Sequence, residues 1–101
     1  MLETPTASDK IITGSVRLIH AAGMHARPAV KLTKLAKKFQ AHVSVRAPNA
    51  EWINAKSVAK VMALRAAHDS ILEIKASGVD AEGAVAALVD LVATDFPDTG
   101  P

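Results

Sequence analysis

The sequence predicts a two-layer α+β sandwich whose elements follow the order strand, helix, strand, strand, helix, strand, helix. Stretches rich in Val, Leu and Ile alternate along the chain with stretches whose apolar residues recur at helical spacing. The helical stretches are apolar along one stripe, as in helices that cover one face of a sheet. The strand stretches alternate between apolar and polar residues, as in a sheet whose second face meets solvent. The length of 101 residues suits one domain with a modest core.

The first half of the chain predicts a strand, a helix and a hairpin. Residues 13–19 alternate weakly and are rich in Val, Leu and Ile, which is typical of a strand. Residues 28–39 carry apolar side chains at a period of about 3.6 residues and predict a helix. Residues 42–47 alternate, and residues 51–54 form a short strand beyond a Pro-Asn-Ala turn. We expect these last two strands to pair with each other.

The second half predicts a helix, a strand and a final helix. Ser57 is a favourable N-cap residue for a helix that extends to about Ala67. Residues 70–77 alternate cleanly between apolar and polar side chains and predict a strand. A Gly-Val-Asp turn follows, in which Asp80 is expected to cap a helix over residues 81–95.

Composition narrows the class of protein. Half of the residues are hydrophobic, but only 3% are aromatic, so the core should consist mainly of Val, Leu, Ile and Ala. The absence of Cys excludes a disulfide framework and fits a cytoplasmic location. We expect no signal peptide and no membrane span, since no apolar run approaches the ~18 residues required. The ordered domain is expected over residues 12–96, between a polar head or linker (1–11) and a tail or linker (97–101).

One motif, residues 23–30 (Gly-Met-His-Ala-Arg-Pro-Ala-Val), combines the features of a phosphoryl-accepting histidine. Gly23 permits a tight backbone approach, and Pro28 suits the first turn of a helix. The free N–H groups at that helix end and the helix dipole favour an anion. Arg27 adds a forked cationic donor for phosphate oxygens. A neutral imidazole at His25 is a nucleophile beside this site, so the motif indicates covalent phosphoryl transfer.

The other histidines fit ordinary structural roles. His20 is expected to end the first strand, His42 to open the second, and His68 to lie near a helix C-terminus, where a proton suits the dipole. A histidine near a helix start is itself more often a cap or a surface residue than a nucleophile, but several features converge around His25. No two histidines have metal-ligand spacing and Cys is absent, so we predict neither a metal nor a cofactor.

Charge is distributed unevenly, although the formal net charge is only +2. Every charged residue from Lys10 to Arg46 is basic, whereas from Asp69 onward the single base is Lys75. This asymmetry indicates an acidic partner or a phosphate near the basic half. For any single lysine, a solvated surface position is the simpler interpretation.

A second motif, residues 54–58 (Asn-Ala-Lys-Ser-Val), opens the second predicted helix. Helix capping alone accounts for Ser57. If the rest of the helix packs on the core, some of the apolar side chains Val58, Ala59 and Met62 must face outward. An exposed Met suits contacts with partners of varied shape.

Together, the two motifs at residues 23–29 and 55–58 resemble HPr, the histidine-containing phosphocarrier family of the bacterial phosphotransferase system. The resemblance covers about residues 12–96 and implies a four-stranded antiparallel sheet with three helices on one face. It implies that His25 takes a phosphoryl group on Nδ1 from phosphorylated Enzyme I and passes it to a sugar-specific IIA protein or domain. Arg27 would be the active-site arginine of that transfer.

The resemblance also bears on regulation and docking. Ser57 matches the serine that a dedicated kinase modifies in some bacteria. The partner-binding positions of the family correspond here to apolar and basic residues: Val58, Ala59, Met62, Lys34, Lys37 and Lys60. The family implies a cytoplasmic monomer that carries a phosphoryl group instead of acting as a stand-alone catalyst, with no bound nucleic acid and no membrane insertion.

Three positions depart from the usual family pattern and bear on partner preference. Ala22 stands where a polar residue is common, Met24 where Leu is usual, and Ala59 where the side chain is often larger. The polar head and the Pro-Asp-Thr-Gly-Pro tail raise an alternative, an HPr-like domain of a multidomain protein in a fructose-type or dihydroxyacetone-kinase-linked system.

Two other classes of function are less favoured. A non-catalytic binding module would not need the pair His25 and Arg27. A small nucleic-acid-binding domain would need a stacking platform on its sheet, for which Trp52 stands alone.

Overall fold

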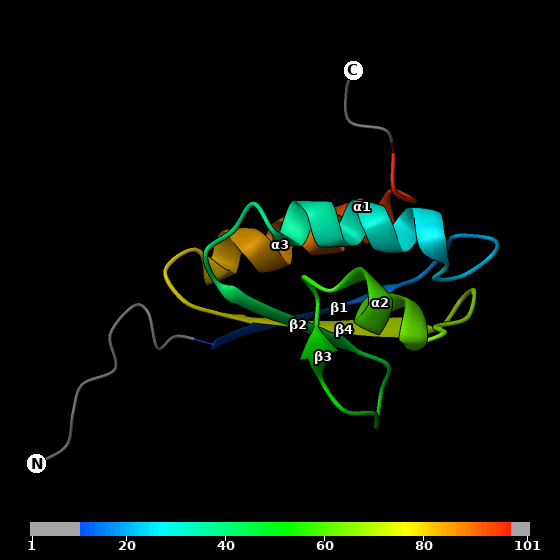
Figure 1. Cartoon of the computed structure of the whole chain (residues 1–101), viewed down its shortest axis with the longest axis horizontal. Helices are drawn as coiled ribbons and strands as arrows, with labels where there is room; N and C mark the ends of the chain where they lie inside the picture. Colours follow the sequence, from blue (N-terminus) through cyan, green and yellow to red (C-terminus); the bar gives the residue numbers. More distant parts are fainter. Residues whose placement is uncertain (1–10, 98–101) are drawn as a thin grey trace, which may run out of the picture.

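The computed structural model describes residues 11–97 and confirms the predicted class and order of elements (Figure 1). The chain runs through strand β1 (Ile11–Arg17), helix α1 (Ala26–Ala36), strand β2 (His42–Arg46), strand β3 (Ile53–Asn54), helix α2 (Val58–Ala63), strand β4 (Ile71–Ser77) and helix α3 (Ala81–Ala93). The predicted head, residues 1–11, and tail, residues 97–101, lie outside the described residues apart from Ile11 and Pro97.

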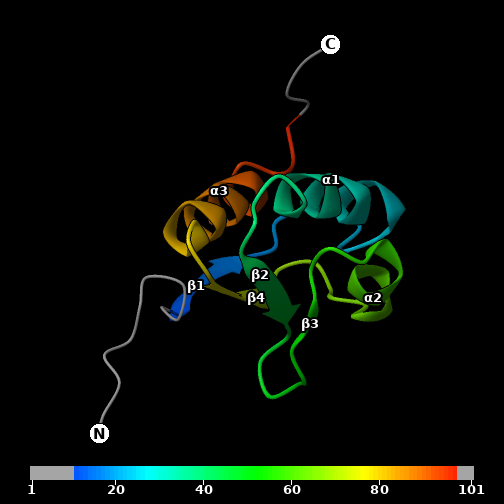
Figure 2. The same cartoon turned by 60° about the vertical axis from the view of Figure 1, so that its left-hand side comes forward.

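The strands form one antiparallel sheet in the order β1-β4-β2-β3. β4 is the last strand in sequence yet lies between β1 and β2, so that Ile74 pairs with both Gly14 and Val45. α1 and α3 lie side by side over one face of the sheet, and the short α2 lies below α1, toward β3 (Figures 1 and 2). The opposite face of the described sheet carries no helix, which agrees with the predicted open-faced sandwich.

The core between sheet and helices is aliphatic, as the composition predicts. Alternate residues of β4 are buried, which places them under the helices. The large side chains that are fully buried include Leu18, Leu32, Leu72, Ile74, Leu88, Val45, Val61 and Val92. Among the aromatic residues, Phe96 is buried in this core, just beyond the end of α3.

β1 ends earlier than the sequence suggests. It ends at Arg17, although strand character was expected to Ile19. The chain leaves the sheet after Leu18, whose N–H donates to the carbonyl of Ser70 and whose carbonyl accepts from the N–H of Asp69. The prediction that His20 ends the first strand is therefore wrong, and His20 lies in the loop that leads to α1.

α2 is also shorter than expected. It ends at Ala63 instead of Ala67, because Arg65 adopts a left-handed backbone conformation with φ of 51° that a helix cannot continue through. Glycine is the residue that commonly marks a left-handed position at a helix end. An arginine at this position gives no clear signal in the sequence that the helix stops here. His68 consequently lies in a loop beyond the helix, and the prediction of a helix C-terminal position for it is wrong. His42 does open β2, as expected.

Asp80 is the N-cap residue of α3, as predicted, but its side chain makes no capping hydrogen bond there. Its carboxylate instead accepts hydrogen bonds from the backbone N–H groups of Gln40 (2.9 Å) and Ala41 (2.8 Å), at the entry to β2. These bonds, above all the one from Gln40, lower the pKa of Asp80 below its ordinary value. The carboxylate thus ties the start of α3 to the segment that follows α1.

We expect Asp80→Asn to lower the melting temperature at pH 7 and to have a smaller effect in acid. Because the pKa is lowered on folding, the ionised carboxylate stabilises the fold above the ordinary value of 3.8, and this contribution is lost as the pH falls through the folded-state value. Thermal melts of both proteins across this range test the prediction. A difference in melting temperature that is the same at pH 7 and in strong acid would contradict it.

Candidate functional site

His25 is the N-cap residue of α1, and its ring is exposed. The backbone is extended (φ −121°, ψ −163°), and its carbonyl accepts the N–H of Ala29 at 3.0 Å. The imidazole makes no capping hydrogen bond, so the ring is not consumed in holding the helix. Pro28 lies in the first turn, as expected. The N–H groups of Ala26 and Arg27 are those that an anion at this helix end would meet.

Gly23 makes the turn that brings His25 to the helix. Its φ is +71°, and its N–H donates to the carbonyl of His20 at 2.9 Å. A Cβ atom at this position would lie 2.5 Å from the carbonyl oxygen of Ala66. That same oxygen accepts the N–H of Met24 at 2.8 Å. The loop of the first motif is therefore bonded to the segment just after α2.

Arg27 lies on the exposed surface of the first turn of α1, two residues from His25. Within residues 11–97, no carboxylate pairs with its guanidinium group. Its forked donors are thus not taken up by an ion pair within the described residues, and the predicted contact with an anion stays a prediction.

His20 is the residue of this site that the sequence interpretation missed. Its Nε2 lies 3.2 Å from Nε2 of His25, and its Nδ1 lies 2.9 Å from Oδ1 of Asp95. The end of α3 supplies Asp95, because α3 runs antiparallel to α1 and ends near the place where α1 begins (Figure 1). His20 lies three residues before Gly23, at the start of the turn that Gly23 closes. This position in the sequence could have indicated that His20 lies near His25. No local pattern could have indicated Asp95, which is 75 residues away.

Comparison with known protein families shows to which family the chain belongs. The model of the family PTS-HPr, described as the "PTS HPr component phosphorylation site", matches residues 12–94.

The chain belongs to the PTS-HPr family. It is a phosphocarrier of the phosphotransferase system, and its partners are proteins of that system.

Similar proteins include both small carriers and a much longer protein. The phosphocarrier protein HPr of Haloferax volcanii is 38% identical over 81 residues, which are 79% of this chain and 91% of that protein. The multiphosphoryl transfer protein of Vibrio cholerae is 40% identical over 78 residues, which are 75% of this chain but only 20% of that protein. Among solved structures, HPr-C-His of Thermoanaerobacter tengcongensis matches with a TM-score of 0.80 at 32% identity, covering 87% of this chain and 98% of the other.

In this HPr-family chain, α2 places its apolar residues on two sides. Ser57 is the N-cap and accepts the N–H of Lys60 at 3.3 Å, as expected of a capping serine. Val61 is fully buried, and Val58 is half-buried against the core. Ala59 and Met62 are exposed. Two of the three expected docking residues thus face solvent, and Val58 does so in part. The basic residues expected to surround them are also exposed: Lys34, Lys37 and Lys60.

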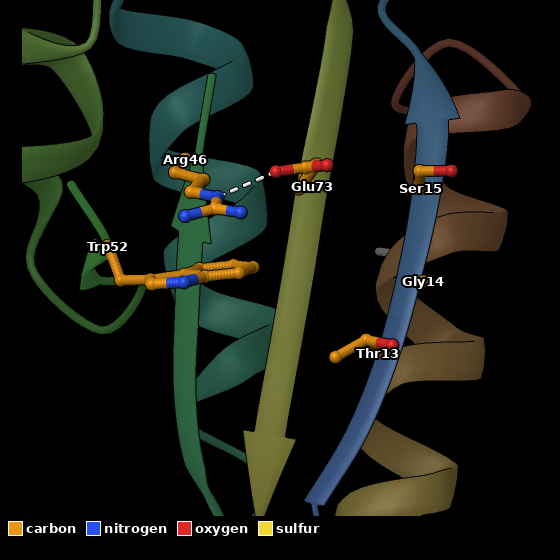
Figure 3. A pocket seen from close by; sticks show the side chains of 6 residues that line it. All are labelled: Thr13, Gly14, Ser15, Arg46, Trp52 and Glu73. Carbon is orange, nitrogen blue, oxygen red and sulfur yellow. Dashed lines mark hydrogen bonds and ion pairs between the residues drawn. The ribbon is translucent and has the colours of Figure 1, made fainter. Parts of the chain in front are cut away.

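The open face of the sheet carries a hollow that does not include His25 (Figure 3). Trp52 lines one side of it. Over the Trp52 ring lie the guanidinium carbon of Arg46, at 4.3 Å from the ring centre, and the ammonium of Lys75, at 4.5 Å. Arg46 also donates from Nε to the Glu73 carboxylate at 2.6 Å. These contacts place both cations against the half-buried indole of this HPr-family chain.

The described part of the chain contains neither a cluster of metal ligands nor a membrane-spanning helix. Over residues 11–97, no group of three or more His, Asp and Glu side chains is arranged to hold a metal ion. No helix in the same range is long and apolar enough to cross a membrane.

Proposed function

We propose that His25 receives a phosphoryl group on Nδ1 from phosphorylated Enzyme I and passes it to a IIA protein or domain. The observation that carries this proposal is the exposed ring of His25 at the start of α1, which is not used as a cap. A neutral imidazole is a competent nucleophile toward phosphorus. The helix N-terminus and Arg27 supply positive charge for the phosphoryl oxygens in transit.

A second candidate function places the chain within a longer protein. The likeness to one fifth of the multiphosphoryl transfer protein of Vibrio cholerae favours it, because that protein's name implies several phosphoryl-transfer steps in one chain. In this case the phosphoryl group would move between domains of one protein, as in a fructose-type or dihydroxyacetone-kinase-linked system. The chemistry at His25 would be unchanged.

The proposal is tested by incubating the protein with Enzyme I and phosphoenolpyruvate and measuring the intact mass. We expect the gain of one phosphoryl group, which brief acid treatment removes. Adding IIA proteins of different sugar classes one at a time should then discharge the protein with the matching class fastest. No gain in mass, under conditions that phosphorylate an HPr of known activity, would contradict the proposal.

Arg27→Ala is expected to slow phosphoryl transfer without disturbing the fold. Losing one charge-assisted contact costs about 1.5–3 kcal/mol, which corresponds to a rate lower by about tenfold or more. Arg27 is exposed, so the melting temperature should stay nearly constant. Rapid-quench measurements of transfer in both directions provide the test, with Arg46→Ala on the opposite face as the matched control. Equal rates for Arg27→Ala and the parent would remove Arg27 from the site.

The surface that meets partners is proposed to surround α2. Met62 is 39% exposed, and Ala59 next to it is exposed as well. The bond from Met24 to Ala66 holds this surface next to the loop of His25. Exposed lysines on α1 and α2 would complement acidic partners. A monomeric state and a cytoplasmic location, expected from the family resemblance, are part of the same proposal.

Ser57→Asp is expected to inhibit phosphoryl transfer while leaving the fold as stable as before or slightly more stable. A carboxylate can replace the hydroxyl as N-cap, and negative charge at a helix N-terminus contributes about 0.3–1 kcal/mol. The same charge would lie beside the proposed docking surface, where an acidic phosphate-bearing partner approaches. Phosphorylation of Ser57 by a kinase would act through the same repulsion, with up to about two charges.

The control for this prediction is Ser57→Ala. Without its cap, this variant should lose about 0.5–2 kcal/mol of stability yet accept the phosphoryl group at the parent rate. Melting temperatures and rates of phosphorylation by Enzyme I are measured for both variants. If Ser57→Asp is phosphorylated as fast as the parent, then Ser57 is only a helix cap.

A further inference from the structure

A second histidine holds the ring of His25. Both ring nitrogens of His20 are engaged, since Nδ1 lies 2.9 Å from Oδ1 of Asp95 and Nε2 lies 3.2 Å from Nε2 of His25. The rings of the two histidines are tilted by 39°, with their centres 5.2 Å apart. Within residues 11–97, nothing hydrogen-bonds Nδ1 of His25. The imidazole of His20 thus bridges a carboxylate and one nitrogen of His25.

The chemistry of these groups determines where the protons lie. An ionised carboxylate only accepts hydrogen bonds, so Nδ1 of His20 must carry its proton. In a neutral imidazole the other nitrogen is then an acceptor, so Nε2 of His20 accepts from Nε2–H of His25. The neutral ring of His25 is consequently the tautomer whose Nδ1 has a lone pair and no proton.

We infer that His20, oriented by Asp95, is a positioning residue for phosphoryl transfer, which holds His25 in the tautomer and ring orientation that leave Nδ1 free to attack. The inference rests on the proposed function, in which Nδ1 of His25 is the acceptor. The bond between Nδ1 and phosphorus forms as the bond between phosphorus and the donor breaks, and that electron pair stays on the donor. The ring of His25 gains positive charge in this step, which strengthens its Nε2–H bond to His20.

The surroundings of His20 keep this bridge in place. The buried ring of Phe96 meets the His20 ring edge-on, with an angle of 88° between them and 6.0 Å between their centres. Phe96 N–H donates to the carbonyl of Leu91, and its own carbonyl accepts from Nζ of Lys31, each at 2.8 Å. Asp95 and Phe96 both have positive φ, of 61° and 52°. This turn at the end of α3 directs the carboxylate toward His20, whose side chain is only 25% exposed.

The tautomers are tested by NMR on the unphosphorylated protein. Long-range correlations between ring protons and ring ¹⁵N atoms distinguish protonated from bare nitrogens, and they are recorded where both rings are neutral. We expect a proton on Nε2 of His25 and on Nδ1 of His20. In His20→Leu, which has similar volume and no polar atom, His25 should populate both tautomers. His20→Gln should restore the single tautomer, because its side-chain oxygen can accept the same hydrogen bond.

The kinetic test uses the same variants with Enzyme I and phosphoenolpyruvate. Losing one hydrogen bond in the transition state should lower kcat about three- to tenfold in His20→Leu, while KM for the carrier stays unchanged. His20→Gln should recover most of the rate. The matched control is His42→Leu, at an exposed position that pairs with Ser77 at the opposite end of the sheet. Melting curves verify that each variant is folded.

The outcomes separate this inference from the proposed function. A parent protein that gains no phosphate on His25 contradicts the proposed function, and the NMR spectra still decide the tautomers. A protonated Nδ1 on His25, or a His20→Leu variant that is phosphorylated at the parent rate, overturns the inference. Equal losses in His20→Leu and His20→Gln also overturn it, since they would indicate packing alone. If His20→Leu fails to fold, Asp95→Ala, at a side chain that is 49% exposed, supplies the same two readings.

Discussion

Replacing His25 with glutamine is expected to abolish phosphoryl acceptance completely. Glutamine is similar in size and can keep the extended N-cap backbone, but its amide nitrogen has no available lone pair to attack phosphorus. The helix terminus and Arg27 would remain, so binding of an anion is preserved while the covalent step is lost. Intact mass after incubation with Enzyme I and phosphoenolpyruvate gives the result directly, because the parent gains one phosphoryl group and the variant gains none.

The remaining histidines provide the controls. His68→Gln lies in an exposed loop and should be phosphorylated like the parent. His20 stays intact in His25→Gln, but its side chain is only 25% exposed, so we expect that it does not substitute as acceptor. Acid-labile phosphate that persists on His25→Gln would show that another residue is the acceptor.

Gly23→Ala is expected to be the most destabilising single-methyl change in the site. The φ of +71° costs a non-glycine residue about 1–2 kcal/mol. The added Cβ would also lie 2.5 Å from the backbone oxygen of Ala66, which is not free to move because it accepts the N–H of Met24. A total loss of at least about 2 kcal/mol corresponds to a melting temperature lower by about 10 °C. Phosphoryl transfer should fall too, because this loop places His25.

Gly83→Ala is the matched control, measured in the same thermal melts. Gly83 lies within α3, its φ is not positive, and an added Cβ would lie 3.6 Å from a ring carbon of Phe39, an ordinary contact. Alanine favours a helix over glycine by up to about 1 kcal/mol, so this variant should be as stable as the parent or more stable. Equal melting temperatures for Gly23→Ala and the parent would contradict the role assigned to the turn.

The chain order and the first motif were predictable because both depend on residues that are near one another in sequence. The periods of two and about 3.6 residues are imposed by the geometry of strands and helices, and they predicted most of the elements. A turn and an N-cap residue predicted the short strand at residues 51–54 and the helix after Ser57. Gly23, His25 and Pro28 act through a turn and a helix start that span only a few residues. The same locality explains the errors at element ends. Arg65 has the left-handed backbone conformation that ends α2, and its residue type does not mark it.

The sequence by itself determined the fold class and the place of His25 at a helix start, with Arg27 two residues on. Only the tertiary structure decided which side chains contact the ring of His25. The sequence predicted that His20 ends a strand and that Asp95 belongs to a helix. The antiparallel packing of α3 on α1 brings the two together, across 75 residues. Likewise, Asp80 was predicted to cap its own helix but bonds the backbone at Gln40 and Ala41. A side chain bonds the partner that packing brings nearest, and that partner is not encoded in local spacing.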